Sequence, residues 1–268
     1  MQKLIAIFFA LAVLLPLSAQ AQTAREIMEM VNKRDDGDNR TSDMEMVLID
    51  KNEQTRSRAI RTFNKDKITD AGQEDRQQLM FFLSPADVKD TGFLTYDYEE
   101  NAKDDDQWLY LPALRKTKRI ASTDKSGSFM GSDFNYSDMT RRNLDAYDYE
   151  LMKEDEVRGA KVWVIKSTPK TREEADNSGY KQGIVFVHQE AKIVVRAVMW
   201  TTTGSKIKYL DMPGLEQIDG IWTPTHMTMK TTKNKVTEHR TELMFKNIQY
   251  GQNLDQDMFT VRQLEKGL

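Results

Sequence analysis

A two-residue alternation of apolar and polar side chains recurs along most of this chain and constrains its fold more than any other feature. In residues 41–50, Met44, Met46 and Leu48 share one side of the chain, and an acidic residue precedes each of the two methionines. This period is typical of a strand that is buried on one face. Similar segments follow at short intervals, with turn residues between them and no long helix. The spacing predicts a mainly β fold, built from an antiparallel sheet of about eleven strands that is either curled or closed.

Helical patterns occur at only two places. Thr23 and Glu26 have the spacing of a capping box, and apolar residues at helical intervals follow them until residues 35–37. Residues 137–146 are a second candidate, with Met139 and Leu144 on the apolar side. We therefore expect one short amphipathic helix after residue 22 and one or two helical turns near the middle of the chain.

Residues 1–21 have the features of a cleaved secretory signal peptide. Lys3 supplies the positive charge, residues 4–17 the apolar stretch, and Ala19-Gln20-Ala21 a small-residue cleavage site. The alternative is an uncleaved membrane anchor, which needs about 20 apolar residues. The chain contains no cysteine and is long enough to bury a core without disulfides. We expect residues 22–268 to form a single domain in the periplasm.

No segment of the sequence has the features of a catalytic centre. His188, His226 and His239 lie in separate strand patterns, without a second ligand at metal-binding spacing. The acidic residues 104–106 lack the spacing of a calcium loop, and no nucleophile elbow, phosphate loop or dinucleotide fingerprint is present. We expect no enzyme activity, no metal and no cofactor. The formal net charge of −3 opposes binding to nucleic acid, so no nucleic-acid partner is expected either.

A loop near the middle of the chain has an unusual composition. It follows a strand that carries Trp108 and Tyr110, and it places large apolar side chains among Gly, Ser and Asp. Loops lie at the surface, where large apolar groups usually cover or contact something. We interpret this loop as the exposed, movable rim of a binding site, formed by Phe129, Met130, Phe134, Tyr136 and Met139.

A basic run lies between that strand and that loop. It consists of Arg115, Lys116, Lys118 and Arg119. One interpretation is a solvated strand end, the usual position of such a run. The other is a docking patch for an acidic partner or for lipid phosphates.

The apolar faces of the expected strands also have two interpretations. They can form a core that the chain fills by itself, as in most all-β proteins. Alternatively, the concave face of a curled sheet can stay partly unfilled and leave an apolar cavity for an acyl chain. The candidate residues are Met44, Met46, Leu48, Phe81, Trp108, Tyr110, Val195, Met199, Ile207, Tyr209, Met227 and Met229.

Four segments together resemble the outer-membrane lipoprotein-sorting proteins. They are FFLSPADVKDTGFL, DQWLYLPALRKTKRI and GSDFNYSDM, followed near the end by DMFTVRQLEKG. More narrowly, the chain resembles the LolA-like periplasmic branch that is often encoded beside RND/MMPL-type exporters. The resemblance places Trp108, Tyr110 and Pro112 on the family's W-x-Y-L-P strand. It places Gly131, Ser132, Asp133, Phe134, Tyr136 and Asp138 in the loop that follows, by the cavity.

This resemblance implies an incomplete barrel whose concave apolar face is covered by short helices. It also implies a monomeric periplasmic carrier that binds the acyl chains of lipoproteins or other lipids and transfers them toward the outer membrane. Its partners would be an inner-membrane RND/MMPL-type exporter and an outer-membrane acceptor. The alternative is a non-enzymatic adaptor of an exporter that carries no lipid.

Overall fold

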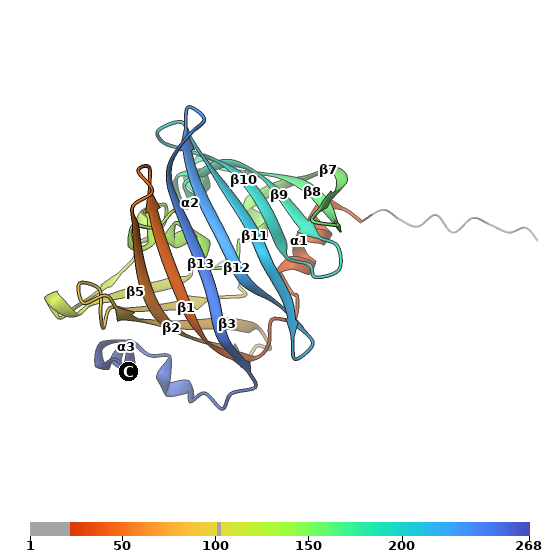
Figure 1. The fold of residues 1–268 in the computed structure, drawn as a ribbon. Helices are drawn as coiled ribbons and strands as arrows, with labels where there is room; N and C mark the ends of the chain where they lie inside the picture. Colours follow the sequence, from red (N-terminus) through yellow and green to blue (C-terminus); the bar gives the residue numbers. More distant parts are fainter. Residues whose placement is uncertain (1–21, 101–102) are drawn as a thin grey trace, which may run out of the picture.

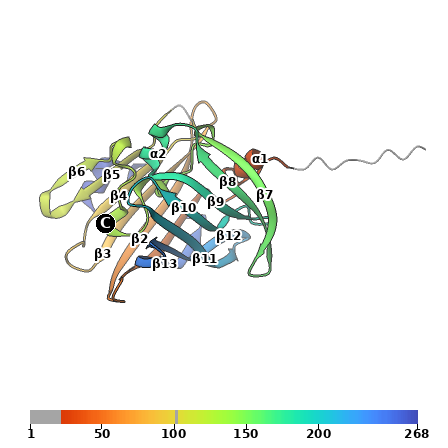
Figure 2. The ribbon, with the colours of Figure 1, turned by 90° about the horizontal axis from the view of Figure 1, so that it is seen from above.

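A computed structural model describes residues 22–100 and 103–268, and the signal peptide expected at residues 1–21 lies outside this part of the chain. Within it, thirteen strands form one antiparallel sheet in the order β6-β5-β4-β3-β2-β1-β13-β12-β11-β10-β9-β8-β7. The sheet curls strongly (Figure 1), and its two ends, β6 and β7, are not paired with each other (Figure 2). The predicted mainly β, curled antiparallel fold is therefore confirmed.

Most of the strands are joined by short connections, and the long exception is residues 120–146 between β6 and β7. The strands are β1 (Asn39–Asp50), β2 (Thr55–Ile68), β3 (Glu74–Ser84), β4 (Gly92–Asp97), β5 (Asp106–Leu111), β6 (Lys116–Arg119), β7 (Tyr147–Val157), β8 (Ala160–Pro169), β9 (Tyr180–His188), β10 (Val194–Thr201), β11 (Lys206–Ile218), β12 (Ile221–Lys233) and β13 (Val236–Tyr250). The α-helices are α1 (Ala24–Asn32), α2 (Arg172–Ser178) and α3 (Val261–Lys266).

Thirteen strands are present where about eleven were expected. The basic run was not counted as a strand, yet Lys116–Arg119 pairs with β5 as the edge strand β6. The expected helical turns in residues 137–146 are 3₁₀ turns at Tyr136–Met139 and Leu144–Ala146. The helix α2 was not expected, because its sequence, REEADNS, has almost no apolar face.

The main core lies on the concave face of the sheet. The capping box predicted at Thr23 and Glu26 is present and begins α1, which buries Ile27 and Met28. These two residues belong to the same apolar cluster as Met46 of β1. A central segment, residues 120–146, crosses the same side of the sheet and contributes Phe129 and Phe134 to this cluster.

The C-terminal segment covers a second apolar cluster on the opposite, convex face. Phe259 and Leu264 pack there with Leu79 and Phe81 of β3, while Met80 and Phe82 of the same strand face the concave core. Figure 1 shows α3 outside the curl of the sheet, and α3 contacts β4 and β5. The expectation that the short helices cover the concave face thus holds for α1 and is wrong for α3. In the described part of the chain, no helix is long and apolar enough to cross a membrane.

Candidate functional site

A cavity of about 860 Å³ opens on the concave face of the sheet. Four methionines from β10, β11 and β12 line its apolar side, and we call them the methionine wall: Met199, Met212, Met227 and Met229. Helix α1 and the central segment close the cavity from the other side with Met28, Val31, Phe134, Met139 and Leu144. The volume lies in the range of small-molecule sites, which is about 300–1,000 Å³.

Strand alternation and one tether explain why these side chains converge. Met227 and Met229 are two residues apart on β12 and therefore point to the same face. Helix α1 is held over them from its first turn, because Arg25 donates to the carbonyl oxygen of Leu144 at 2.6 Å and to Asp145 at 2.7 Å. The helix and the central segment are therefore fixed to each other above the sheet.

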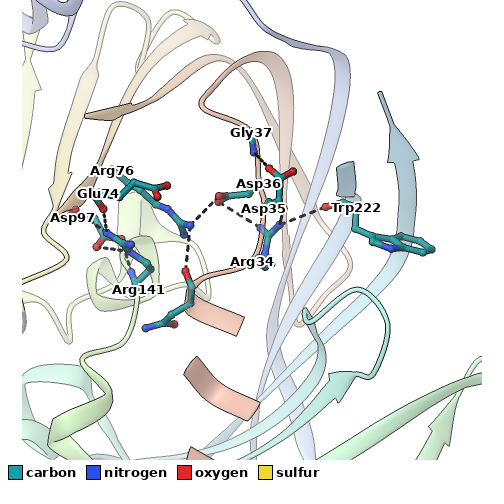
Figure 3. Close-up of polar contacts among 10 residues, drawn as sticks. Arg34, Asp35, Asp36, Gly37, Glu74, Arg76, Asp97, Arg141 and Trp222 are labelled. Atoms are coloured by element: carbon teal, nitrogen blue, oxygen red, sulfur yellow. Dashed lines mark hydrogen bonds and ion pairs between the residues drawn. The ribbon is translucent and has the colours of Figure 1, made fainter. Parts of the chain in front are cut away.

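The other end of the cavity is polar and rich in arginine (Figure 3). We call Arg34, Arg40 and Arg76 the arginine cluster; all three line the cavity. Arg76 lies 2.9 Å from Asp36, and Arg34 lies 3.7 Å from the same carboxylate. Arg34 also donates to the carbonyl oxygen of Trp222 at 3.5 Å. The loop after α1 is thus linked by ion pairs and hydrogen bonds to both halves of the curled sheet.

Two carboxyl groups beside the cluster have raised pKa values. Burial, followed by a hydrogen bond to Glu74, raises the pKa of Asp66 to about 8. Burial also raises the pKa of Asp97, although the charge and hydrogen bonds of Arg141 oppose this shift. Arg141 donates to Asp97 through its main-chain nitrogen at 2.7 Å and its Nε at 3.0 Å (Figure 3). Because its pKa is about 8, Asp66 is mostly protonated at neutral pH.

Buried hydrogen bonds anchor the central segment to the sheet. The Asp133 carboxylate accepts from Thr231 at 2.5 Å and from Thr241 at 2.7 Å, and it contacts Nδ1 of His239 at 2.6 Å. Farther along the segment, the hydroxyl of Tyr180 donates to Asp138 at 2.8 Å. These contacts hold residues 133–138 against the concave face.

The structure brings only part of the expected cavity set to the cavity. Met199, Met227 and Met229 line it, as part of the methionine wall. Met44, Met46 and Leu48 lie on the same concave face but are packed into the main core, away from the cavity surface. For β1, the filled-core interpretation therefore describes the structure better than the cavity interpretation.

The remaining expected cavity residues point elsewhere, so their assignment to the cavity was wrong. Phe81, Trp108 and Tyr110 pack on the convex face under the C-terminal segment. Both faces of β3 are apolar, so alternation alone could not select the inner one. Val195 lies at a break in the pairing of β9 with β10; it packs in the cluster that contains Val162 and Met212 and does not itself line the cavity.

Strand β11 is oriented one residue differently from the expectation. Lys208 and Leu210 face the concave side, where Lys208 reaches the central segment and Leu210 lines the cavity. Because successive side chains alternate, Ile207 and Tyr209 point to the convex side. Their assignment to the cavity was wrong, because the hydrogen bonds of Lys208 outweigh the greater apolarity of its neighbours.

The aromatic loop is mostly part of the core and not an exposed rim. Phe134 and Met139 line the cavity, whereas Phe129, Met130 and Tyr136 do not. Phe129 is 1% exposed, and its ring centre lies 4.9 Å from that of Phe93 and 5.7 Å from that of Tyr136. The expectation of exposed aromatic side chains in this loop is wrong, because the curled sheet leaves a concave face that the loop itself fills.

The basic run is on the surface, at the edge of the sheet. Lys118 lies 3.1 Å from Asp124, and Arg119 is paired with Asp106, so half of the run is neutralised within the chain. Among the described residues, Arg115 and Lys116 have no ion-pair partner within 4.0 Å. Across those same residues, no group of three or more acidic, histidine or cysteine side chains is arranged to hold a metal ion.

Sequence reasoning missed the arginine cluster entirely, although a signal for it was available. Arg40 precedes Met44 by four residues and Arg76 precedes Met80 by four residues, so each shares the inward face of its strand. Extending the alternation toward the start of β1 and β3 would have placed both arginines on the concave side. The pattern was missed because polar residues were taken to end the buried strands.

Comparisons with known proteins agree with this architecture. A family model described as "Uncharacterized protein"-like matches residues 74–266. A domain from Vibrio parahaemolyticus named for outer membrane lipoprotein sorting is 29% identical, with a TM-score of 0.78 over 90% of this chain and 98% of that one. A DUF1329 family protein from Desulfovibrio piger is 28% identical, with a TM-score of 0.79 over 90% of this chain and 97% of that one.

A LolA superfamily protein from Nitrosomonas europaea shares the fold at 16% identity, with a TM-score of 0.64 over 91% of this chain and 100% of that one. No curated protein matches the chain. The family model covers most of the chain, and the two structures at 28–29% identity match nearly its whole length. The chain therefore belongs to the family that this model describes, and it shares its fold with a domain named for outer membrane lipoprotein sorting and with a LolA superfamily protein.

Proposed function

We propose that this protein is a periplasmic carrier that holds the acyl chains of lipoproteins or other lipids in its concave cavity. The single observation that carries the proposal is the 860 Å³ cavity beside the methionine wall. Burying an acyl chain stabilises the complex by about 0.8 kcal/mol per methylene. Methionine side chains are flexible and polarizable, so a wall of four of them can adapt to chains of different shape.

The carrier acts without catalysis, as a monomer that passes its cargo between membranes. Transfer from one apolar site to another of equal quality is nearly neutral in free energy, so an acceptor can take the cargo without an energy source. The proposal includes an inner-membrane RND/MMPL-type exporter as the donor and an outer-membrane acceptor. Arg115 and Lys116 support docking to an acidic surface of such a partner, because both are exposed where the edge strand β6 begins.

Lipid retention tests the proposal directly. The exported protein, purified without detergent, is analysed by native mass spectrometry, and the delipidated protein is titrated with a fluorescent fatty acid. We expect a bound lipid in the first experiment and saturable binding in the second. A protein that never retains lipid and never protects the fluorescent chain would instead support the adaptor function.

A matched pair of methionine substitutions locates the binding site. Met227→Lys places a charge on the methionine wall at a half-buried position, whereas Met152→Lys changes a methionine that is 49% exposed on β7. Burying an ammonium against an acyl chain is costly. We expect Met227→Lys to weaken fatty-acid binding by about tenfold or more. Met152→Lys should leave it unchanged, and an equal effect of both would place the lipid outside the cavity.

A further inference from the structure

The arginine cluster has more positive charge than its neighbours neutralise. Arg34 and Arg76 share one carboxylate, that of Asp36. In residues 22–100 and 103–268, the Arg40 side chain has no ion-pair or hydrogen-bond partner. Three guanidinium groups therefore line one end of the cavity, and two of them share the carboxylate of Asp36.

The next carboxyl group does not correct this imbalance. Asp66 is opposite Arg76 in the pairing of β2 with β3, but it is mostly protonated at neutral pH because its pKa is about 8. Burial lowers the pKa of Arg34, and the positive charges of Arg76 and Arg40 add to this effect while Asp36 opposes it. Arg34 is thus close enough to Arg40 and Arg76 for their positive charges to repel it.

Hydrogen-bond donors at this end of the cavity are also unsatisfied. Arg40 Nε, Asn64 Nδ2 and Arg76 Nε are buried and have no partner in the described part of the chain. They come from the adjacent strands β1, β2 and β3, and Arg40 lies directly opposite Asn64 in the sheet. Buried donors are nearly always paired in folded proteins, so three unpaired donors on one concave surface indicate a ligand with several acceptor oxygens.

We infer that the arginine cluster binds the phosphate headgroup of an anionic amphiphile whose acyl chain lies along the methionine wall, an inference that rests on the proposed carrier function. Guanidinium groups form paired, charge-assisted hydrogen bonds with phosphate oxygens. A phosphate offers enough acceptor oxygens for Arg40, Asn64 and Arg76 together. The arginine cluster and the methionine wall line one continuous cavity, so a single amphiphile can reach both.

Binding of two lipids with the same acyl chains tests the headgroup site. The delipidated full chain is loaded with the neutral probe N-phenylnaphthylamine, which is then displaced by dipalmitoyl phosphatidylglycerol or by dipalmitoylglycerol. We expect phosphatidylglycerol to bind about tenfold or more tightly, because only it brings a phosphate. Arg40→Gln should remove this preference. Arg56→Gln, at an exposed position of β2 outside the cavity, should change neither affinity.

Other results of the same experiment would overturn the inference in distinguishable ways. Equal affinity of the wild type for both lipids, or a preference that survives Arg40→Gln, would disprove the headgroup site and leave the carrier function intact. Arg40-dependent binding of inorganic phosphate in titration calorimetry, with neither lipid releasing the probe, would assign the site to free phosphate. Palmitate binding as tightly as phosphatidylglycerol, with the same dependence on Arg40, would assign it to a carboxylate. Failure of every lipid to bind would disprove both the inference and the carrier function.

Discussion

Lys208 and Asp133 are joined on the concave side of the sheet, where the Lys208 ammonium donates to the main-chain carbonyl oxygen of Asp133 at 2.5 Å. The same ammonium donates to Oδ1 of Asn135 at 2.6 Å, and Lys208 is only 8% exposed. Burial lowers the pKa of Lys208, and the charges of Asp138 and Asp133 oppose that shift. A strand in the second half of the sheet thus holds the central segment in position over the cavity.

Replacing Lys208 by methionine should destabilise the protein. Lys208→Met keeps a long side chain but leaves the Asp133 carbonyl and the Asn135 amide oxygen without a donor, which costs about 1–3 kcal/mol. Urea unfolding measures the free-energy change. Lys206→Met on the same strand is the control, because the Lys206 side chain is 41% exposed and its ion pair with Glu238 is worth at most about 1 kcal/mol. Equal effects of the two substitutions would show that the anchor is unimportant.

The sheet could be predicted from the sequence because each strand repeats the same local pattern. The face of β11 could not be predicted in this way. Ile207 and Tyr209 are more apolar than Lys208, and only the distant Asp133 and Asn135 make the inward orientation of Lys208 favourable. Long-range hydrogen bonds of this kind cannot be detected in the alternation of apolar and polar residues along the strand.

The cavity was predictable only in outline. The methionines of β10 and β12 follow the alternation and reach the cavity. Trp108 and Tyr110 follow it equally well, yet they pack under Phe259, which is more than a hundred residues away in the chain. Where both faces of a strand are apolar, the segment that covers each face decides which residues meet a ligand.

Truncating Phe129 tests whether the central segment is core or rim. Phe129→Ala removes a ring that is 1% exposed and packed against Phe93 and Tyr136, so we expect a loss of about 3–5 kcal/mol in unfolding free energy. Leu114→Ala, in the turn before β6, is the control, because Leu114 is 63% exposed and its truncation should cost less than about 0.5 kcal/mol. A loss below about 1 kcal/mol for Phe129→Ala would restore the rim interpretation.

The C-terminal segment should stabilise the sheet from its convex side. Phe259 is 1% exposed, and its carbonyl oxygen accepts from the hydroxyl of Tyr96 on β4. Phe259→Ala should therefore cost about 3–5 kcal/mol and speed the hydrogen exchange of β4 and β5 amides. Leu268→Ala is the control, because Leu268 is 69% exposed. If the amide hydrogens of β4 and β5 exchange equally fast in Phe259→Ala and in the wild type, the C-terminal segment does not stabilise these strands.

The raised pKa of Asp66 predicts how stability varies with pH. Asp66 titrates near 3.8 when unfolded and at about 8 when folded, so between these values the folded state binds the extra proton. The contribution of Asp66 to the free energy of unfolding is fully present below about pH 4 and is lost as pH rises toward 8. Asp66→Asn cannot ionise, so its stability relative to wild type should increase between pH 6 and pH 9 in urea unfolding. Asp70→Asn, in the exposed turn after β2, should run parallel to wild type over the same range. A gap between Asp66→Asn and wild type that stays constant with pH would mean that Asp66 is ionised in the folded protein, and the arginine cluster would then have a second carboxylate beside it.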